Sequence, residues 1–217
     1  MANDFTTREE VLAVYRKRAR RYDLTANAYY LLGFREWAYR KRAIEALSLQ
    51  RGDTVIEIGC GTGLIFGLLE ERIGPEGRLI RVDLADAMLS QARARVEASG
   101  WRNIELVESP ASSFRSPPEV DGILSTFALT LEPDFDRVVE EGAKALKPGR
   151  RWVILDLKLP SNWLRHLTPV LIALVRPFAV SEEVAKRRPW ESLRRHLKQV
   201  SMQELYFGVA YIAVGEA

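Results

Sequence analysis

Short apolar runs alternate with amphipathic stretches through the middle of the chain. Runs of aliphatic and β-branched residues predict buried strands at about residues 54–58, 78–83, 104–108, 121–125 and 151–157. Apolar residues at helical spacing predict helices at about residues 63–73, 86–99 and 134–146. Because strands and helices alternate from Gly52 onward, we expect an α/β fold whose parallel sheet is built from right-handed crossovers.

The two flanks follow other patterns. Residues 6–21 show helical spacing and end in a strongly basic run, and an aromatic-rich helical stretch then continues to Leu47. Residues 158–199 form an insertion whose apolar-rich run, about twelve residues, is too short to span a bilayer. It predicts a buried core helix, the roof of an apolar pocket or an interfacial segment. The tail, residues 200–215, alternates apolar and polar positions as strands do, with Gly208 at a turn or bulge.

Three alternate glycines follow the first predicted strand, where residues 54–63 read TVIEIGCGTG. Glycine allows backbone angles and close approaches that a Cβ would forbid. A glycine turn between a buried strand and a helix is typical of nucleotide-binding units. Leu64 stands where the dinucleotide fingerprint has its third glycine, and Glu57 precedes the turn to give E-x-G-x-G-x-G. The alternative is an ordinary strand–turn–helix whose glycines serve geometry alone.

An acid ends the second predicted strand. Asp83 lies twenty residues beyond Gly63. A carboxylate at this distance from the glycine turn can accept both ribose hydroxyls of a nucleoside. The alternative is that Asp83 caps the helix that begins near Asp86.

The glycine motif and Asp83 resemble those of the class I S-adenosylmethionine (SAM)-dependent methyltransferases. The resemblance implies a Rossmann-like seven-stranded sheet with helices on both faces and a C-terminal antiparallel hairpin. It also implies a single domain over residues 1–217, divided into four parts. These are a helical lid (1–51), a cofactor-binding core (52–157), a substrate-side insertion (158–199) and a terminal hairpin (200–217). SAM would be the cofactor and S-adenosylhomocysteine (SAH) the product.

The N-terminal region is similar to that of the quinone-biosynthesis methyltransferases and of bacterial phosphatidylethanolamine N-methyltransferases, because the pair Tyr22-Asp23 precedes a helix leading into the glycine motif. The resemblance implies that Tyr22 lies near the sulfonium methyl, in a catalytic and cofactor-binding position. Tyr15, Tyr29 and Tyr30 could contact a methylammonium group of the substrate through cation–π interactions. Plain packing of these aromatic rings against the sheet is the alternative.

The expected cofactor site combines these motifs with the loops at the carboxyl ends of the strands. Its residues are Tyr22, Glu57, Gly59, Cys60, Gly61, Thr62, Gly63, Asp83, Leu84, Met88, Pro110, Ala111, Ser125, Thr126 and Phe127. Leu84 and Met88 are placed to cover the adenine ring, with core packing as the alternative for Met88.

Two departures from the family pattern affect this site. Ser109 and Pro110 replace the usual Gly-Asp, so adenine would be read by backbone groups or by Ser112 or Ser113. The loop after the fourth strand lacks the histidines that relatives often carry, so an evident general base is missing there.

Composition narrows the chemistry further. A single cysteine excludes an intrachain disulfide and a cysteine-rich metal site, and two histidines argue against zinc. Residues 1–51 carry a net charge of +5, residues 52–156 one of −6 and residues 157–199 one of +6. The basic flanks indicate contact with an anionic surface such as lipid headgroups, or simply solvated helical faces. Without a signal-peptide pattern, the cytoplasm is the expected location, with a peripheral position at the inner membrane surface as an open alternative.

Three functional hypotheses remain. The first is a methyltransferase acting on an amphipathic or lipid-like small molecule, such as the amine of a phospholipid. The second is C- or O-methylation of a quinol or a soluble aromatic metabolite, and the third is a SAM-binding module without transfer activity. Nucleic acid is not expected as a partner, because the fourth-strand loop lacks an Asn-Pro-Pro-Tyr or Asp-Pro-Pro-Tyr motif.

Overall fold

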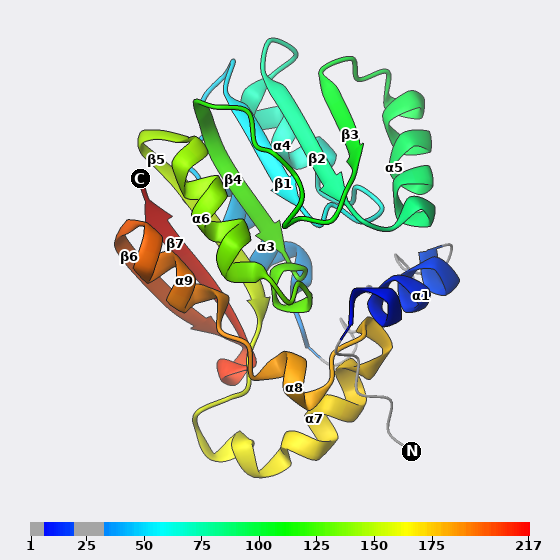
Figure 1. Cartoon of the computed structure of the whole chain (residues 1–217), viewed down its shortest axis with the longest axis vertical. Coiled ribbons are helices and arrows are strands. Elements are labelled where there is room, and N and C mark those ends of the chain that lie inside the picture. Colours follow the sequence, from blue (N-terminus) through cyan, green and yellow to red (C-terminus); the bar gives the residue numbers. More distant parts are fainter. Residues whose placement is uncertain (1–6, 20–32) are drawn as a thin grey trace.

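The computed structural model describes residues 7–19 and 33–217 of the chain, and its centre is one seven-stranded sheet in the order β3-β2-β1-β4-β5-β7-β6 (Figure 1). The strands are β1 (Thr54–Ile58), β2 (Arg78–Asp83), β3 (Ile104–Glu108), β4 (Val120–Thr126), β5 (Leu146–Leu157), β6 (Lys198–Leu205) and β7 (Ala210–Glu216). The first five strands pair in parallel, whereas β7 runs antiparallel to both β5 and β6. The predicted Rossmann-like sheet with a C-terminal antiparallel pair is therefore confirmed.

Helices cover both faces of the sheet (Figure 1). On one face lie α3 (Glu36–Ala46) and α4 (Phe66–Ile73), and on the other lie α6 (Phe135–Ala145) and α9 (Pro189–His196). Successive side chains of β5 point to opposite faces of the sheet and so contribute to the core on each face. Trp152 and Ile154 pack with α6 and α9, whereas Val153 and Leu155 pack with α3 and α4. Helix α5 (Asp86–Ser99) packs beside β2 and β3.

The remaining helical elements gather beyond the carboxyl ends of the parallel strands (Figure 1). They are α1 (Arg8–Arg18), η3 (Leu129–Leu131), η4 (Trp163–Leu167), α7 (Thr168–Val175), η5 (Arg176–Phe178), α8 (Glu182–Ala185) and η6 (Tyr206–Gly208). The loops of a parallel sheet form its ligand crevice at this edge. None of the helices described by the structure has the length and apolar character needed to cross a membrane.

Several element boundaries differ from the sequence prediction, and β5 differs most, since it begins at Leu146 and not at residue 151. Helix α4 begins at Phe66 and not at residue 63, because the preceding residues complete the glycine turn, in which Phe66 N–H donates to the Gly63 carbonyl at 3.2 Å. The alternation of the tail is interrupted at Phe207, which lies in the η6 turn with a positive φ and is 74% exposed.

Candidate active site

The glycine turn lies at the carboxyl end of β1 and is fastened to β2. The N–H groups of Gly59 and Cys60 both donate to the Val82 carbonyl, at 2.8 and 3.1 Å. Gly59 has φ +72°, and a Cβ there would overlap the Cβ of Ala128 in the loop after β4. Glycine at this position therefore allows the loops after β1 and β4 to come into contact, and this contact forms one wall of the site.

Asp83 ends β2 and supports the same turn. Its Oδ2 accepts the Gly61 N–H at 2.7 Å, and its Oδ1 accepts the Ala85 N–H at 2.9 Å. Burial raises the pKa of this carboxyl, and the backbone donors lower it part of the way back. The side chain both closes a tight turn just before α5 and faces the cavity in front of Gly61, where no atom lies within 4 Å of a notional Cβ.

Glu57 lies beneath the turn and not in the cavity. It is 1% exposed and forms a buried ion pair with Arg81 on the neighbouring strand. The Arg81 guanidinium in turn lies 4.3 Å from the centre of the Phe66 ring. This arrangement gives Glu57 a supporting position under the loop.

A cavity, which we call the cofactor cleft, opens above Gly59, Gly61 and Asp83. Its wall is formed by the ends of β1, β2 and β4, by the loop after β3 and by one face of α1. The residues lining it are Arg8, Val11, Leu12, Tyr15, Arg40, Ile58, Gly59, Cys60, Gly61, Thr62, Leu64, Val82, Asp83, Leu84, Ala85, Ser109, Ala111, Thr126, Phe127, Ala128, Leu129, Leu131 and Glu132.

Helix α1 closes one side of the cleft and makes charged contacts near both of its ends. The Arg8 guanidinium bonds to Glu132 at 2.6 Å, Asp134 at 2.5 Å and the Ser112 hydroxyl at 2.6 Å. At the other end of the helix, Arg16 pairs with Asp86 of α5 at 2.7 Å. No residue of α1 itself is fully buried, but Leu12 and Tyr15 are partly buried against Ala85 and Met88, so charged and apolar contacts together position the helix.

Arg40 is a cleft residue that the sequence analysis missed. It projects from α3, is 6% exposed and donates to the Thr126 hydroxyl at 2.6 Å. Its guanidinium also pairs with Glu36 at 2.7 Å and lies 5.2 Å from the centre of the Phe127 ring. The available signal was the Glu36/Arg40 spacing of four residues, which on a helix usually marks an ordinary surface pair. A guanidinium in this position can bind a carboxylate.

A second cavity, which we call the acceptor pocket, adjoins the cofactor cleft, and Tyr15, Phe127 and Leu131 line both cavities. Its wall is largely aliphatic and aromatic. The other residues lining it are Phe34, Glu36, Thr130, Asp156, Leu157, Leu171, Leu174, Val175, Phe178, Val180, Ala185, Tyr206 and Val209. Glu36 and Asp156 are its two carboxylates, at positions to which the sequence analysis assigned no role.

The structure brings together most of the predicted cofactor residues. Gly59, Cys60, Gly61, Thr62, Asp83, Leu84, Ala111, Thr126 and Phe127 line the cofactor cleft, and Tyr15 lies between the two cavities. Glu57, Gly63, Met88, Pro110 and Ser125 lie outside its lining. Tyr22, Tyr29 and Tyr30 fall outside the described residues.

Met88, Ser112 and Ser113 lie outside the cofactor cleft, and their contacts or exposure show where each one is instead. Met88 is 1% exposed and packs with Ala19 and Ala85, which matches the core-packing alternative. The Ser112 hydroxyl accepts a hydrogen bond from Arg8, and Ser113 is exposed. Neither residue lines the cleft where adenine was expected. Over residues 7–19 and 33–217, no three potential metal-ligating side chains cluster together.

Comparison with known proteins gives consistent matches. The model described as the ubiE/COQ5 methyltransferase family matches residues 4–173. Demethylmenaquinone methyltransferases from Listeria welshimeri and Listeria monocytogenes are 29% identical to the chain over 157 residues, or 72% of it. The matched region spans 66% and 65% of these two relatives, so the chain covers just under two thirds of their lengths.

Solved structures share the fold. A chain in the complex between the Haloferax volcanii Trm112 methyltransferase activator and a putative methyltransferase has a TM-score of 0.71 at 19% identity, covering 94% of this chain and 97% of that one. A SAM-dependent methyltransferase from Aquifex aeolicus has a TM-score of 0.59 at 19% identity, covering 81% and 87%. At these identities the matches establish the architecture alone.

Proposed function

The chain belongs to the ubiE/COQ5 methyltransferase family, and we propose that it transfers the methyl group of SAM to an amphipathic quinol. The observation that carries the proposal is the junction of the two cavities. A cleft built on the glycine turn and Asp83 opens, past Tyr15, Phe127 and Leu131, into a pocket with an apolar wall. Methyl transfer needs a donor and an acceptor held in line with water excluded, and two adjoining cavities provide that arrangement.

The residues that line the cofactor cleft suggest which of them would hold each part of SAM. Asp83 would accept the ribose hydroxyls beside the open face of Gly61, and Leu84 would lie against the adenine. Arg40 would bind the carboxylate of the methionine part in addition to its contacts with Glu36 and Thr126, because its guanidinium borders the cleft. When bound, SAM supplies an activated methyl group on a sulfonium. The position of Tyr22 near that methyl stays a prediction, because Tyr22 lies outside the described residues.

A quinol suits the acceptor pocket better than a phospholipid amine does. The pocket wall is apolar and aromatic, as the ring and the side chain of a quinol require. Demethylmenaquinone is the substrate in the names of the relatives, which favours the quinol alternative over the phospholipid amine that the sequence analysis placed first. A quinol has no methylammonium group, so the cation–π role expected for Tyr15 is not part of this proposal.

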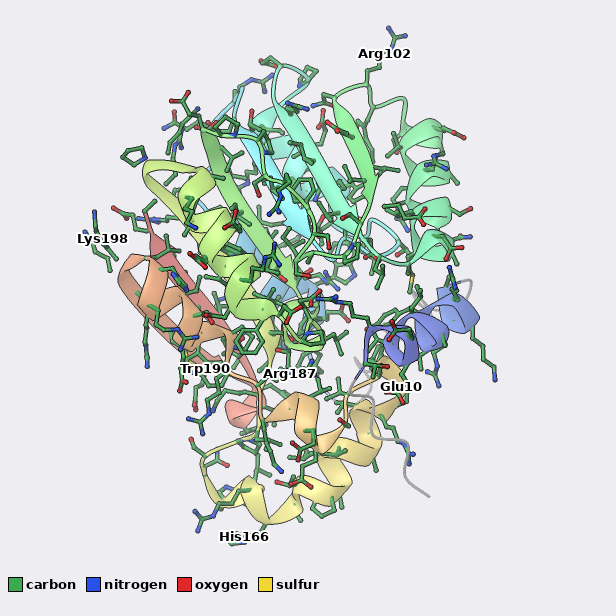
Figure 2. All side chains as sticks on the ribbon, viewed as in Figure 1. Glu10, Arg102, His166, Arg187, Trp190 and Lys198 are labelled. Atoms are coloured by element: carbon green, nitrogen blue, oxygen red, sulfur yellow. The ribbon has the colours of Figure 1, made fainter. Side chains whose placement is uncertain are left out.

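An apolar surface next to the acceptor pocket supports peripheral contact with a membrane. The large hydrophobic side chains that are exposed in the described chain are Trp163, Leu167, Val170, Leu174 and Phe207. The Asn162 amide donates to the Phe207 carbonyl at 2.7 Å, which joins the η6 turn to the start of η4. His166 points away from the sheet at this end of the molecule (Figure 2). A quinol held in a bilayer would meet the pocket here, because Leu174 both is exposed and lines that pocket.

The decisive experiment is transfer of labelled methyl from SAM to reduced demethylmenaquinone, compared with phosphatidylethanolamine vesicles. We expect the label in the quinol ring. Label in the phospholipid, or none in either acceptor with SAM binding intact, would refute the proposal.

Membrane contact is tested separately by flotation with anionic vesicles. Trp163→Ser with Val170→Ser should reduce recovery with the vesicles, and Arg165→Ser should reduce it less. Arg102→Ser removes the same charge from the opposite end of the molecule (Figure 2) and is the matched control. Equal recovery of all the variants would argue against this surface.

A further inference from the structure

A buried carboxylate borders the acceptor pocket. Asp156 is the second-last residue of β5 and is 3% exposed. Its Oδ2 accepts the N–H of Thr130 at 2.9 Å, and its Oδ1 accepts the N–H of Leu157 at 2.8 Å. These donors hold the carboxylate where β5 meets the η3 turn, and each oxygen keeps a further lone pair.

The elements packed around Asp156 bring few charges to it. Tyr211 stands opposite it on β7, and the phenol has a raised pKa because of burial first and the Asp156 charge second. Arg187 donates to the carbonyls of Thr130 and Leu131 at 3.0 Å, and Glu36 pairs with Arg40. Among the residues that the structure describes, no arginine or lysine forms an ion pair with Asp156.

This environment changes the acidity of the group. Burial raises the pKa of Asp156 from 3.8 to about 6, while the backbone donors lower it only in part. The carboxylate is therefore mainly ionised at neutral pH, yet it holds a proton more strongly than an exposed aspartate does. A proton acceptor works best when its pKa lies near the working pH.

We propose that Asp156 is the proton acceptor of the methyl transfer, taking the hydroxyl proton of the quinol in the acceptor pocket. This inference rests on the proposed function. The sequence analysis found no evident base in the loop after β4. Asp156 would supply one from the neighbouring strand β5, and Thr130 of that loop helps to orient it through its N–H. The other carboxylate of the pocket, Glu36, is engaged by Arg40.

The proton balance of the reaction is simple. The Asp156 carboxylate takes the O–H proton, and the electron pair of that bond makes the adjacent ring carbon nucleophilic. The ring carbon bonds to the methyl group, and the electron pair of the sulfur–carbon bond stays on sulfur. The methylated carbon then releases its C–H proton to water, while Asp156 returns its proton to the oxygen. One proton is released per transfer, and the carboxylate is regenerated.

The first test is Asp156→Asn in the full chain, with Asp136→Asn on the exposed face of α6 as a matched control. Loss of a general base should lower turnover by roughly 10²- to 10⁴-fold. We expect SAH affinity to stay within about threefold, since Asp156 lies outside the cofactor cleft. Asp156→Glu should recover part of the activity, which guards against a loss caused by misfolding.

A second test separates a base from a structural residue. Turnover of the wild type should rise with pH to a plateau above about pH 6, as Asp156 ionises, and the Asn variant should lack this limb. A halogenated quinol has a more acidic hydroxyl and depends less on a base. The loss of turnover caused by Asp156→Asn should therefore be at least about tenfold smaller with this acceptor. A merely structural defect would impair both acceptors equally.

A third test needs no turnover. In SAM-free protein, a naphthol should bind more tightly than its methyl ether, because only the naphthol can donate to Asp156. This preference should fall about tenfold in the Asn variant. The proposal is overturned if the preference persists, if the Asn variant turns over normally, or if its deficit is the same for every acceptor. A wild type that binds SAM but methylates no quinol would instead overturn the proposed function, and this inference with it.

Discussion

The buried carboxylate of Asp156 should make the protein less stable as pH rises. The folded-state pKa of about 6 lies above the ordinary 3.8 of an aspartate, so the folded state binds the proton more tightly than the unfolded state does. The contribution of this group to stability is then fully present below about pH 4 and is lost as pH rises through about 6. At about 1.36 kcal/mol per pKa unit, the total is about 3 kcal/mol, of which nearly half falls between pH 5 and pH 7.

Urea unfolding of the wild type and of Asp156→Asn at several pH values measures this effect. Other titrating groups occur in both proteins, so they cancel in the difference between the two free energies of unfolding. We expect the wild type to lose about 1 kcal/mol relative to the variant between pH 5 and pH 7. Tyr211 stays neutral over this range because its pKa is raised well above 10.

A flat difference between the two proteins over that range would refute the reasoning. It would mean that Asp156 has an ordinary acidity in the folded state, and its suitability as a proton acceptor would fail with it. A difference of the opposite slope would mean that an unrecognised cation stabilises the ionised form.

Three further predictions concern the cofactor cleft. Asp83→Ala should weaken SAM binding by at least about 100-fold in calorimetry, because two charge-assisted hydrogen bonds to the ribose are lost, whereas Asp136→Ala on the exposed face of α6 should leave it nearly unchanged. Arg40→Gln should weaken SAH binding by roughly tenfold or more but alter adenosine binding little, and equal losses would show that Arg40 does not bind the carboxylate. Gly59→Ala should lower the free energy of unfolding by about 1–3 kcal/mol, because the new Cβ meets Ala128 at a positive φ. Ala128→Gly should then restore part of that loss, and strict additivity of the two changes would contradict this contact.

Local patterns predicted the sheet well. The strands at residues 54–58, 78–83 and 104–108 and the helix at 86–99 were predicted with the bounds that the structure shows. The predicted resemblance to the quinone-biosynthesis methyltransferases is confirmed by the family match. Runs of buried apolar residues between glycine and proline breaks specify such elements through short-range interactions alone.

Residues whose role depends on long-range packing were harder to predict. Arg40 resembles a helical surface partner of Glu36, and Asp156 resembles the polar end of a strand. Only the fold places the first beside Thr126 and the second beside the acceptor pocket. Ser112 shows the converse, because its hydroxyl is occupied by Arg8, more than 100 residues away in the chain.

The way in which α1 is held also determines how the cofactor cleft can open. The helix has no fully buried residue and is held by Arg8, Arg16 and the partly buried Leu12 and Tyr15. None of these belongs to the sheet core, so detachment of the helix leaves that core intact. It should form a separate unit of local unfolding, whose amides exchange with solvent hydrogen far faster than those of β1 or β4. Salt should speed that exchange, because the charges of Arg16 and Asp86 are exposed to solvent. Cofactor and product can then exchange through a low-energy local opening, while the rest of the molecule keeps its native structure.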